Sequence, residues 1–115
     1  MKKRTDFLVI GSGIAGLTFA LKAVKYGKVT IVTKANLEDT NTRYAQGGIA
    51  AVFSEPDNFE KHISDTLIAG GGICNEEVVR MVVHEAPDRI KDLIKMGVSF
   101  DKKEDGTYDL AKEGG

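Results

Sequence analysis

Three glycines near the start of the chain have the spacing of a phosphate-binding turn. Gly11, Gly13 and Gly16 are the first, third and sixth residues of the hexapeptide GSGIAG. Between a strand and a helix, the first glycine permits a tight bend, the second lets the backbone approach a pyrophosphate, and the third lets the helix pack on the strand. The N–H groups of the first helical turn then face the phosphates, where the helix dipole contributes about 0.3–1 kcal/mol per anionic group. The pattern predicts that backbone groups bind a dinucleotide.

The flanking residues supply the elements that such a turn needs. Residues 7–10 are an apolar run, FLVI, and residues 29–32, VTIV, give a second β-branched strand. The helical pattern between them has apolar residues at i, i+4 and i+7: Leu17, Leu21 and Val24. Gly27 is expected to end this helix. Residues 1–34 therefore predict a dinucleotide-binding βαβ unit.

The second strand ends in Thr33 and Lys34, where the dinucleotide fingerprint has an Asp or Glu that binds the ribose hydroxyls. A lysine cannot accept that hydrogen bond, but its stem can lie along an adenosine and its ammonium can reach a phosphate. This difference weakens the case for NAD and favours another adenine dinucleotide. An ordinary solvated strand end is the alternative interpretation of Lys34.

The bulk composition excludes several kinds of partner. The 115 residues are 42% hydrophobic and 29% charged, which is ordinary for a globular protein. The net charge of −1 gives no field that would attract nucleic acid or an anionic membrane. Cys74 is the single cysteine, so no internal disulfide forms. We expect a cytoplasmic protein without nucleic-acid or membrane partners.

Residues 41–53, NTRYAQGGIAAVF, divide into two halves. The first half is dense in hydrogen-bonding groups, and the second is an apolar run. Gly47 and Gly48 between them allow the backbone to bend and to approach a ligand. Such a loop is suited to wrap a flat cofactor, and a plain surface loop that leads into a buried element is the alternative.

Residues 54–97 are expected to form three helices in succession. Ser54 begins the pattern of a capping box for the first helix. Asn75 is a suitable cap for the second, which is expected to end near His84. Pro87 is comfortable in a first turn, so the third helix is expected to begin there.

Residues 98–110 alternate apolar and polar side chains around Asp105 and Gly106, which predicts a β-hairpin. His62 has no nucleophile or metal ligand spaced with it, so no metal site is expected. The sequence shows two convincing strands, whereas about four to six parallel strands cover a dinucleotide in such folds. We therefore expect this chain to belong to a larger fold.

Several of these segments together resemble the N-terminal region of the L-aspartate oxidase family. They are GSGIAG, the lysine at the second strand end, NTRYAQGGIAAVF and DTLIAGGGICNEEVV. These flavoproteins are related to the flavin subunits of succinate dehydrogenase and fumarate reductase, and the resemblance covers essentially the entire chain. It implies an α/β fold in which a Rossmann-like FAD-binding βαβ unit is followed by helices and a β-hairpin. Residues 1–115 would form an incomplete N-terminal portion of the larger flavoprotein fold.

The resemblance also assigns roles to individual residues. It implies that the glycine turn cradles the FAD pyrophosphate, that Lys34 lies beside the adenosine, and that residues 41–48 line the flavin. Membrane-bound succinate dehydrogenases carry a flavin-linked histidine where this chain has Asn41, so FAD is expected to be non-covalent. Glu113, in the EGG motif, is expected to meet the substrate amino group. The expected FAD-binding residues are Gly11, Ser12, Gly13, Ile14, Ala15, Gly16, Lys34, Asn41, Thr42, Arg43, Tyr44, Ala45, Gln46, Gly47 and Gly48.

The implied activity is the oxidation of L-aspartate to iminoaspartate, the first step of de novo NAD biosynthesis. A hydride leaves the α-carbon for the flavin N5, oxygen or fumarate is the electron acceptor, and iminoaspartate is handed over to quinolinate synthase. The family's catalytic groups lie beyond residue 115, so the chain alone is expected to be inactive. Two alternatives stay open: a soluble fumarate reductase or succinate oxidase, against which Glu113 argues, and a non-catalytic nucleotide-binding module that self-associates.

Overall fold

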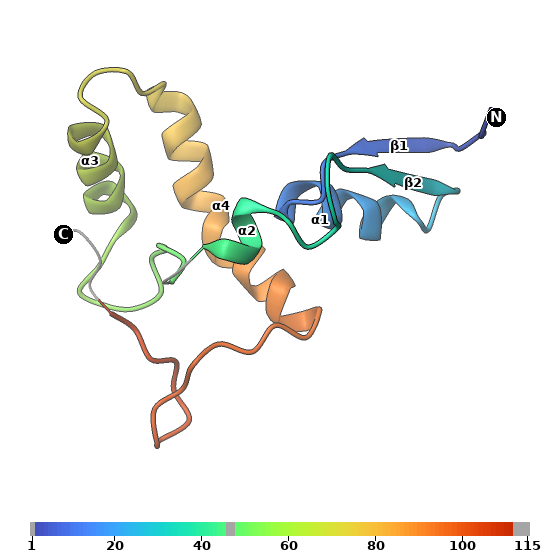
Figure 1. Ribbon diagram of the computed structural model, residues 1–115. Coiled ribbons are helices and arrows are strands. Elements are labelled where there is room, and N and C mark those ends of the chain that lie inside the picture. Colours follow the sequence, from blue (N-terminus) through green and yellow to red (C-terminus); the bar gives the residue numbers. More distant parts are fainter. Residues whose placement is uncertain (1, 46–47, 112–115) are drawn as a thin grey trace. The chain divides into compact units, whose positions relative to one another are not determined.

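The computed structural model describes residues 2–45 and 48–111 of the chain (Figure 1). The chain divides into two compact units, Met1–Gly48 and Ile49–Gly115. The first unit is mixed α/β and the second is built mainly from two helices. Among the described residues, no helix is both long enough and apolar enough to cross a membrane.

The first unit has the predicted βαβ topology. Strand β1, Phe7–Ile10, pairs in parallel with β2, Val29–Val32, and helix α1, Ile14–Ala23, connects them. Such a parallel pair needs a crossover connection, and α1 supplies it. The small core between helix and sheet contains Val9, Ala20 and Ala23, each less than a tenth exposed.

Helix α1 differs from its sequence prediction in extent and in its buried face. It begins at Ile14, three residues before the apolar pattern, and its C-cap is Val24. The predicted apolar residues Leu17, Leu21 and Val24 are 38%, 58% and 58% exposed, whereas Ala20 and Ala23 are buried. Small side chains allow the helix to lie close to the sheet, so the packing selects the alanine face.

Gly27 does not end α1. Its lack of a side chain instead leaves room for a contact between Asp6 and Lys28. The carboxylate of Asp6 accepts a hydrogen bond from the N–H of Lys28 at 2.7 Å. A Cβ at Gly27 would lie 2.7 Å from that same carboxylate oxygen. Gly27 therefore leaves room for the contact that fixes the start of β1 against the entry to β2.

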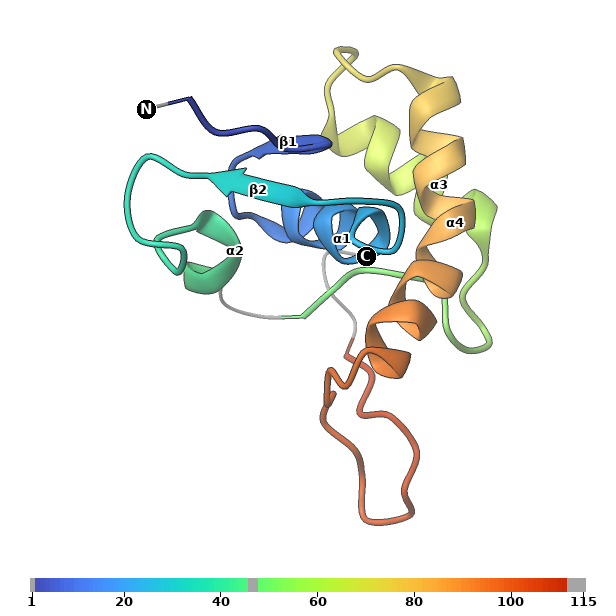
Figure 2. The same ribbon diagram turned by 90° about the vertical axis from the view of Figure 1, so that its right-hand side faces the viewer.

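The second unit packs helix α3, Phe59–Ala69, against helix α4, Glu76–Lys95 (Figures 1 and 2). Its buried side chains are Ile63, Val83 and Ile90. Asn58 caps α3 by accepting a hydrogen bond from the N–H of Lys61 at 2.9 Å. The expected capping box at Ser54 is therefore wrong, because the helix begins at Phe59 and its cap comes directly before it.

Helix α4 is continuous, which corrects the prediction of two helices separated near Pro87. Asn75 caps it as predicted, and Pro87 lies inside it. His84 is consequently in mid-helix, where its ring lies 4.5 Å from that of Phe59 on α3. His84, three residues before the proline, packs against α3, and Ile90, three residues after it, is also buried. Tertiary packing on both sides of the proline therefore offsets the hydrogen bond that a proline cannot donate. Gly97, with a φ of 103°, lies just beyond the C-terminal end of α4.

Residues 98–110 form a turn with a single antiparallel bridge, between Lys102 and Tyr108, rather than two full strands. The N–H of Lys103 donates to the Thr107 carbonyl at 2.8 Å, and Gly106 has the positive φ of 83° that the turn requires. The predicted Asp-Gly turn is present. The pairing on either side of it is shorter than the alternating pattern indicated.

Candidate functional site: the glycine turn and the N-terminus of α1

The glycine turn joins the end of β1 to the start of α1. Gly11 has a φ of 102°, a conformation that favours glycine, and its N–H donates to the Val32 carbonyl at 2.8 Å. Gly13 is the N-cap of α1 and supplies no side chain to the helix end. The first N–H groups of a helix have no partner within it, so this end presents donors and a partial positive charge.

The three glycines allow a test of whether the turn fits a dinucleotide. A Cβ at Gly16 would lie 2.5 Å from the Gly11 carbonyl oxygen and 3.2 Å from Val9 Cγ1, so helix and strand meet only because Gly16 lacks one. A Cβ at Gly13 would meet only Thr42 Oγ1, at 3.5 Å. The bend and the close packing that the fingerprint requires are both present, so the residues of the turn fit a dinucleotide. The approach of a pyrophosphate to Gly13 stays a prediction.

Ser12 has a buried side chain, which is 4% exposed. Its hydroxyl lies 3.4 Å from Thr33 Oγ1, a long hydrogen bond between the turn and the residue after β2. The sequence prediction included Ser12 and missed Thr33, which it described only as the strand end. The predicted parallel pairing of the two strands could have indicated Thr33, because such pairing places the residues that follow the two strands side by side.

The segment expected to line a flavin contains a short helix. Helix α2, Asn41–Tyr44, occupies part of what was predicted as a loop, and Thr40 caps it by accepting from the N–H of Arg43 at 3.1 Å. Thr42 Oγ1 accepts a hydrogen bond from the N–H of Ile14 at 3.2 Å. The structure therefore brings this segment to the N-terminal end of α1.

The other expected FAD-binding residues differ in their surroundings. Lys34 is exposed, and so are the residues of α2. Arg43 forms an ion pair with Glu38 at 2.9 Å, and the Tyr44 hydroxyl donates to Asp39 at 2.9 Å. Gln46, Gly47 and Glu113 were also expected to contact cofactor or substrate, and they lie outside the described residues.

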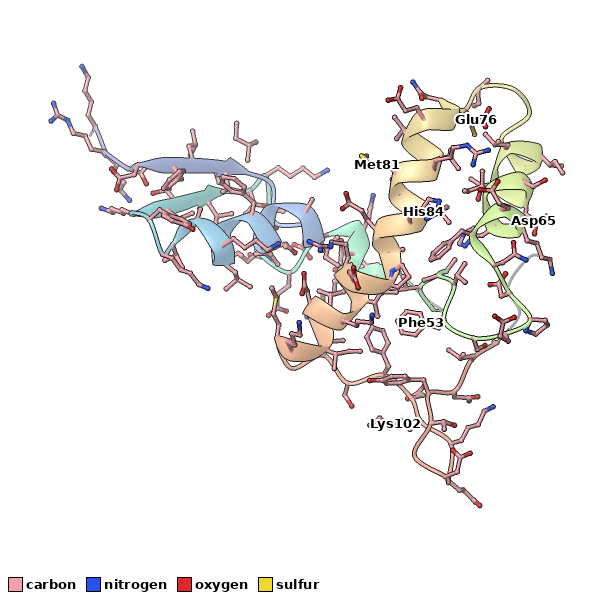
Figure 3. The ribbon with its side chains drawn as sticks, turned by 180° about the vertical axis from the view of Figure 1, so that it is seen from behind. Phe53, Asp65, Glu76, Met81, His84 and Lys102 are labelled. Atoms are coloured by element: carbon pink, nitrogen blue, oxygen red, sulfur yellow. The ribbon has the colours of Figure 1, made fainter. Side chains whose placement is uncertain are left out.

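The second unit has a hollow of about 600 Å³ beside the turn of residues 98–110. The Phe53 and Tyr108 rings meet edge to face at 6.4 Å, and the Lys102 ammonium lies 5.4 Å from the Tyr108 ring centre. Figure 3 labels Phe53 and Lys102 in this part of the second unit. None of the residues expected to bind FAD lines it. In the described ranges, no group of three His, Cys, Asp or Glu side chains could hold a metal ion.

Comparison with known proteins decides the family. The sequence profile of the FAD binding domain matches residues 6–115. The chain belongs to the FAD binding domain family. FAD is the cofactor of this family, as predicted, and the glycine turn has the bend and the close helix packing of the dinucleotide fingerprint.

Individual relatives agree with this assignment. The FAD binding domain is 55% identical over 113 residues to the chloroplastic L-aspartate oxidase of Oryza sativa subsp. japonica, covering 98% of the chain and 18% of that protein. It is 51% identical over 115 residues to the L-aspartate oxidase of Vibrio cholerae, covering 96% of the chain and 22% of that protein. The predicted resemblance to L-aspartate oxidases is confirmed, although the chain spans only about a fifth of the length of these relatives.

Solved structures share the fold. Sdh1 of Mycobacterium smegmatis, in complex with UQ1, superposes with a TM-score of 0.85 at 32% identity, over 96% of this chain and 19% of that one. The E. coli quinol fumarate reductase superposes with a TM-score of 0.84 at 31% identity, over 93% of this chain and 19% of that one. These similarities confirm the predicted α/β fold of the FAD binding domain.

Proposed function

We propose that this chain is the FAD-binding portion of an L-aspartate oxidase. Such an enzyme oxidises L-aspartate to iminoaspartate, uses oxygen or fumarate as acceptor, and begins NAD biosynthesis. One observation carries the proposal: the chain is 43–56% identical to proteins named L-aspartate oxidase from plants and bacteria. Its identity to the solved Sdh1 and fumarate reductase structures is lower, at 31–32%.

The part of this chain in the reaction is to hold and orient FAD, which when bound supplies the hydride acceptor. The glycine turn and the N-terminus of α1 would receive the pyrophosphate. Lys34 would lie beside the adenosine, and residues 41–48 would line the flavin. The contact between Thr42 and Ile14 supports this arrangement, because it joins the segment that would hold the pyrophosphate to the segment that would line the flavin, and these are neighbouring parts of one ligand.

Glu113 would set the preference for an amino acid substrate. A carboxylate beside the substrate ammonium stabilises aspartate, and it is left unpaired when a plain dicarboxylate binds. Hand-over of iminoaspartate to quinolinate synthase would follow release. The isolated chain would be inactive and would self-associate, because apolar side chains such as Ile10 and Ile73 are 83% and 93% exposed.

A fumarate reductase or succinate oxidase is the second candidate. The TM-score of 0.84 to the E. coli quinol fumarate reductase favours it, because that similarity extends over 93% of this chain. The two candidates share their FAD-binding fold and differ in substrate. Substrate preference therefore separates them.

A chimeric enzyme tests the proposal. Residues 1–115 of this chain would replace the aligned segment of the Vibrio cholerae L-aspartate oxidase. The chimera is expected to purify yellow, to release its flavin on denaturation, and to be reduced by L-aspartate in preference to succinate. A folded chimera without flavin would refute the proposal, and preferential reduction by succinate would favour the second candidate.

A variant of the same chimera tests the role of Glu113. Glu113→Gln removes the charge and keeps the size, so kcat/KM for L-aspartate is expected to fall by about tenfold or more. The flavin content should stay unchanged. An unaltered kcat/KM would show that Glu113 does not meet the substrate ammonium.

A further inference from the structure

Ser12 is unusual because it is a buried polar residue in a turn that must meet a ligand. Within residues 2–45 and 48–111, it is the one polar side chain that is buried, at 4% exposure. Buried polar groups in folded proteins have hydrogen-bond partners. The partner of the Ser12 hydroxyl is Thr33 Oγ1, 3.4 Å away. The Ser12 side chain thus points into the protein and contacts Thr33.

A second link lies directly beside this one. The N–H of Gly11 donates to the Val32 carbonyl at 2.8 Å. Consecutive residues of the turn are therefore joined to consecutive residues at the end of β2, once through the backbone and once through side chains. The next residue of the chain is Lys34, which is exposed. The two links connect the turn to the residue expected beside the adenosine.

We propose that the hydroxyl pair of Ser12 and Thr33 is a positioning device for the adenosine diphosphate half of FAD. The pair holds the turn against the end of β2, so that the N–H donors of the turn and Lys34 keep a fixed spacing. The Ser12 side chain does not contact a phosphate; only the backbone of Ser12 faces the ligand. This inference rests on the proposed function, because it assumes that the turn holds FAD.

The energetic reason is preorganisation. A turn that is already fixed loses little conformational entropy when the ligand binds, whereas a loose turn must be ordered by the ligand. Either hydroxyl alone gives no link, so the loss of one should weaken binding as much as the loss of both. A direct contact between Ser12 and a phosphate makes a different prediction, because Thr33 would then have no effect.

The experiment is a double-mutant cycle in the chimeric oxidase described above. Ser12→Ala and Thr33→Val each remove one hydroxyl, the double variant removes both, and Thr33→Ser keeps the hydroxyl as a conservative variant. Thr30→Val is the matched control, since it is the same substitution on β2 itself. The readouts are the Kd of FAD and the Kd of ADP, measured by calorimetry on flavin-free protein. Thermal unfolding identifies any variant that fails to fold.

Each single variant and the double variant are expected to raise the Kd of FAD by about two- to fivefold, which is the effect of losing a modest hydrogen bond. The Kd of ADP should rise by the same factor. The Thr33→Ser and Thr30→Val variants should bind both ligands as tightly as the unsubstituted chimera does. Weakening by Ser12→Ala alone, additive losses, or no loss at all would each overturn the inference. A chimera that binds neither FAD nor ADP would overturn the proposed function together with it.

Discussion

The Thr42 hydroxyl accepts a hydrogen bond from the backbone N–H of Ile14, 28 residues earlier in the chain. Ile14 is the first residue of α1, and Thr42 lies in α2. The first N–H groups of a helix have no intrahelical partner, so a hydroxyl there acts as a cap supplied from another element. The segment expected at the flavin is thereby attached to the segment expected at the pyrophosphate.

Removal of this cap should destabilise the first unit. Thr42→Val keeps the shape of the side chain and removes the acceptor, so the free energy of unfolding is expected to fall by about 0.5–1 kcal/mol. Thr42→Ser keeps the hydroxyl, so its free energy of unfolding should be close to that of the unsubstituted chain. Urea unfolding followed by circular dichroism measures the difference. Equal stability of the valine and serine variants would show that the contact contributes nothing.

Gly16→Ala should disturb the contact between α1 and β1. The new Cβ would lie 2.5 Å from the Gly11 carbonyl oxygen, so the helix must move away from the turn. We expect a loss of about 1–3 kcal/mol in the free energy of unfolding, as for overpacked interiors, and weaker FAD binding. Gly48→Ala is the control for stability, because a Cβ there meets nothing within 4 Å. A Gly16→Ala chain as stable as that control would contradict the packing seen here.

The start of α3 gives a prediction that separates the structure from the sequence pattern. Asn58 accepts from the N–H of Lys61, so Asn58→Ala is expected to lower the free energy of unfolding by about 1 kcal/mol. Ser54→Ala removes the cap that the sequence indicated, and it should change stability by only a few tenths of a kcal/mol. Chemical denaturation of both variants decides between the two positions. The reverse order of effects would restore the capping box at Ser54.

The features that the sequence predicted correctly are those that depend on neighbouring residues. The glycine turn needs only the bend at Gly11, the packing at Gly16 and the apolar runs around them, and all lie within one short stretch. The sequence did not predict contacts between distant residues, such as those of Ser12 with Thr33 and Thr42 with Ile14, because they depend on how strands pair and loops return. Tertiary packing likewise overrode local preference in α4.

The turn of residues 98–110 makes a prediction about pH. The Thr107 hydroxyl and N–H both donate to the Asp105 carboxylate, at 2.6 and 2.9 Å, and these bonds lower the pKa of Asp105 below its ordinary value. A carboxyl whose pKa is lowered on folding stabilises the turn above the unfolded pKa of about 3.9, and the contribution is lost as pH falls through the folded pKa.

Thr107→Val removes the hydroxyl bond and keeps the backbone bond, so the pKa of Asp105 should rise toward its ordinary value. Thr107→Ser keeps both bonds and is the matched control. A carbon-detected NMR titration of the Asp105 carboxyl measures the change. An identical pKa in the valine and serine variants would show that the hydroxyl does not interact with the carboxylate.

Pro87 tests whether α4 is one helix or two. Inside a helix, a proline cannot donate to the carbonyl four residues earlier, here that of the buried Val83, and its ring crowds that carbonyl. Pro87→Ala should therefore raise the free energy of unfolding by up to about 3 kcal/mol. Glu85→Ala, an exposed change on the same helix, should alter it by only a few tenths. If a helix instead began at Pro87, the proline would be in a favourable first turn and its replacement would leave stability unchanged or lower, because alanine leaves the unfolded chain more freedom.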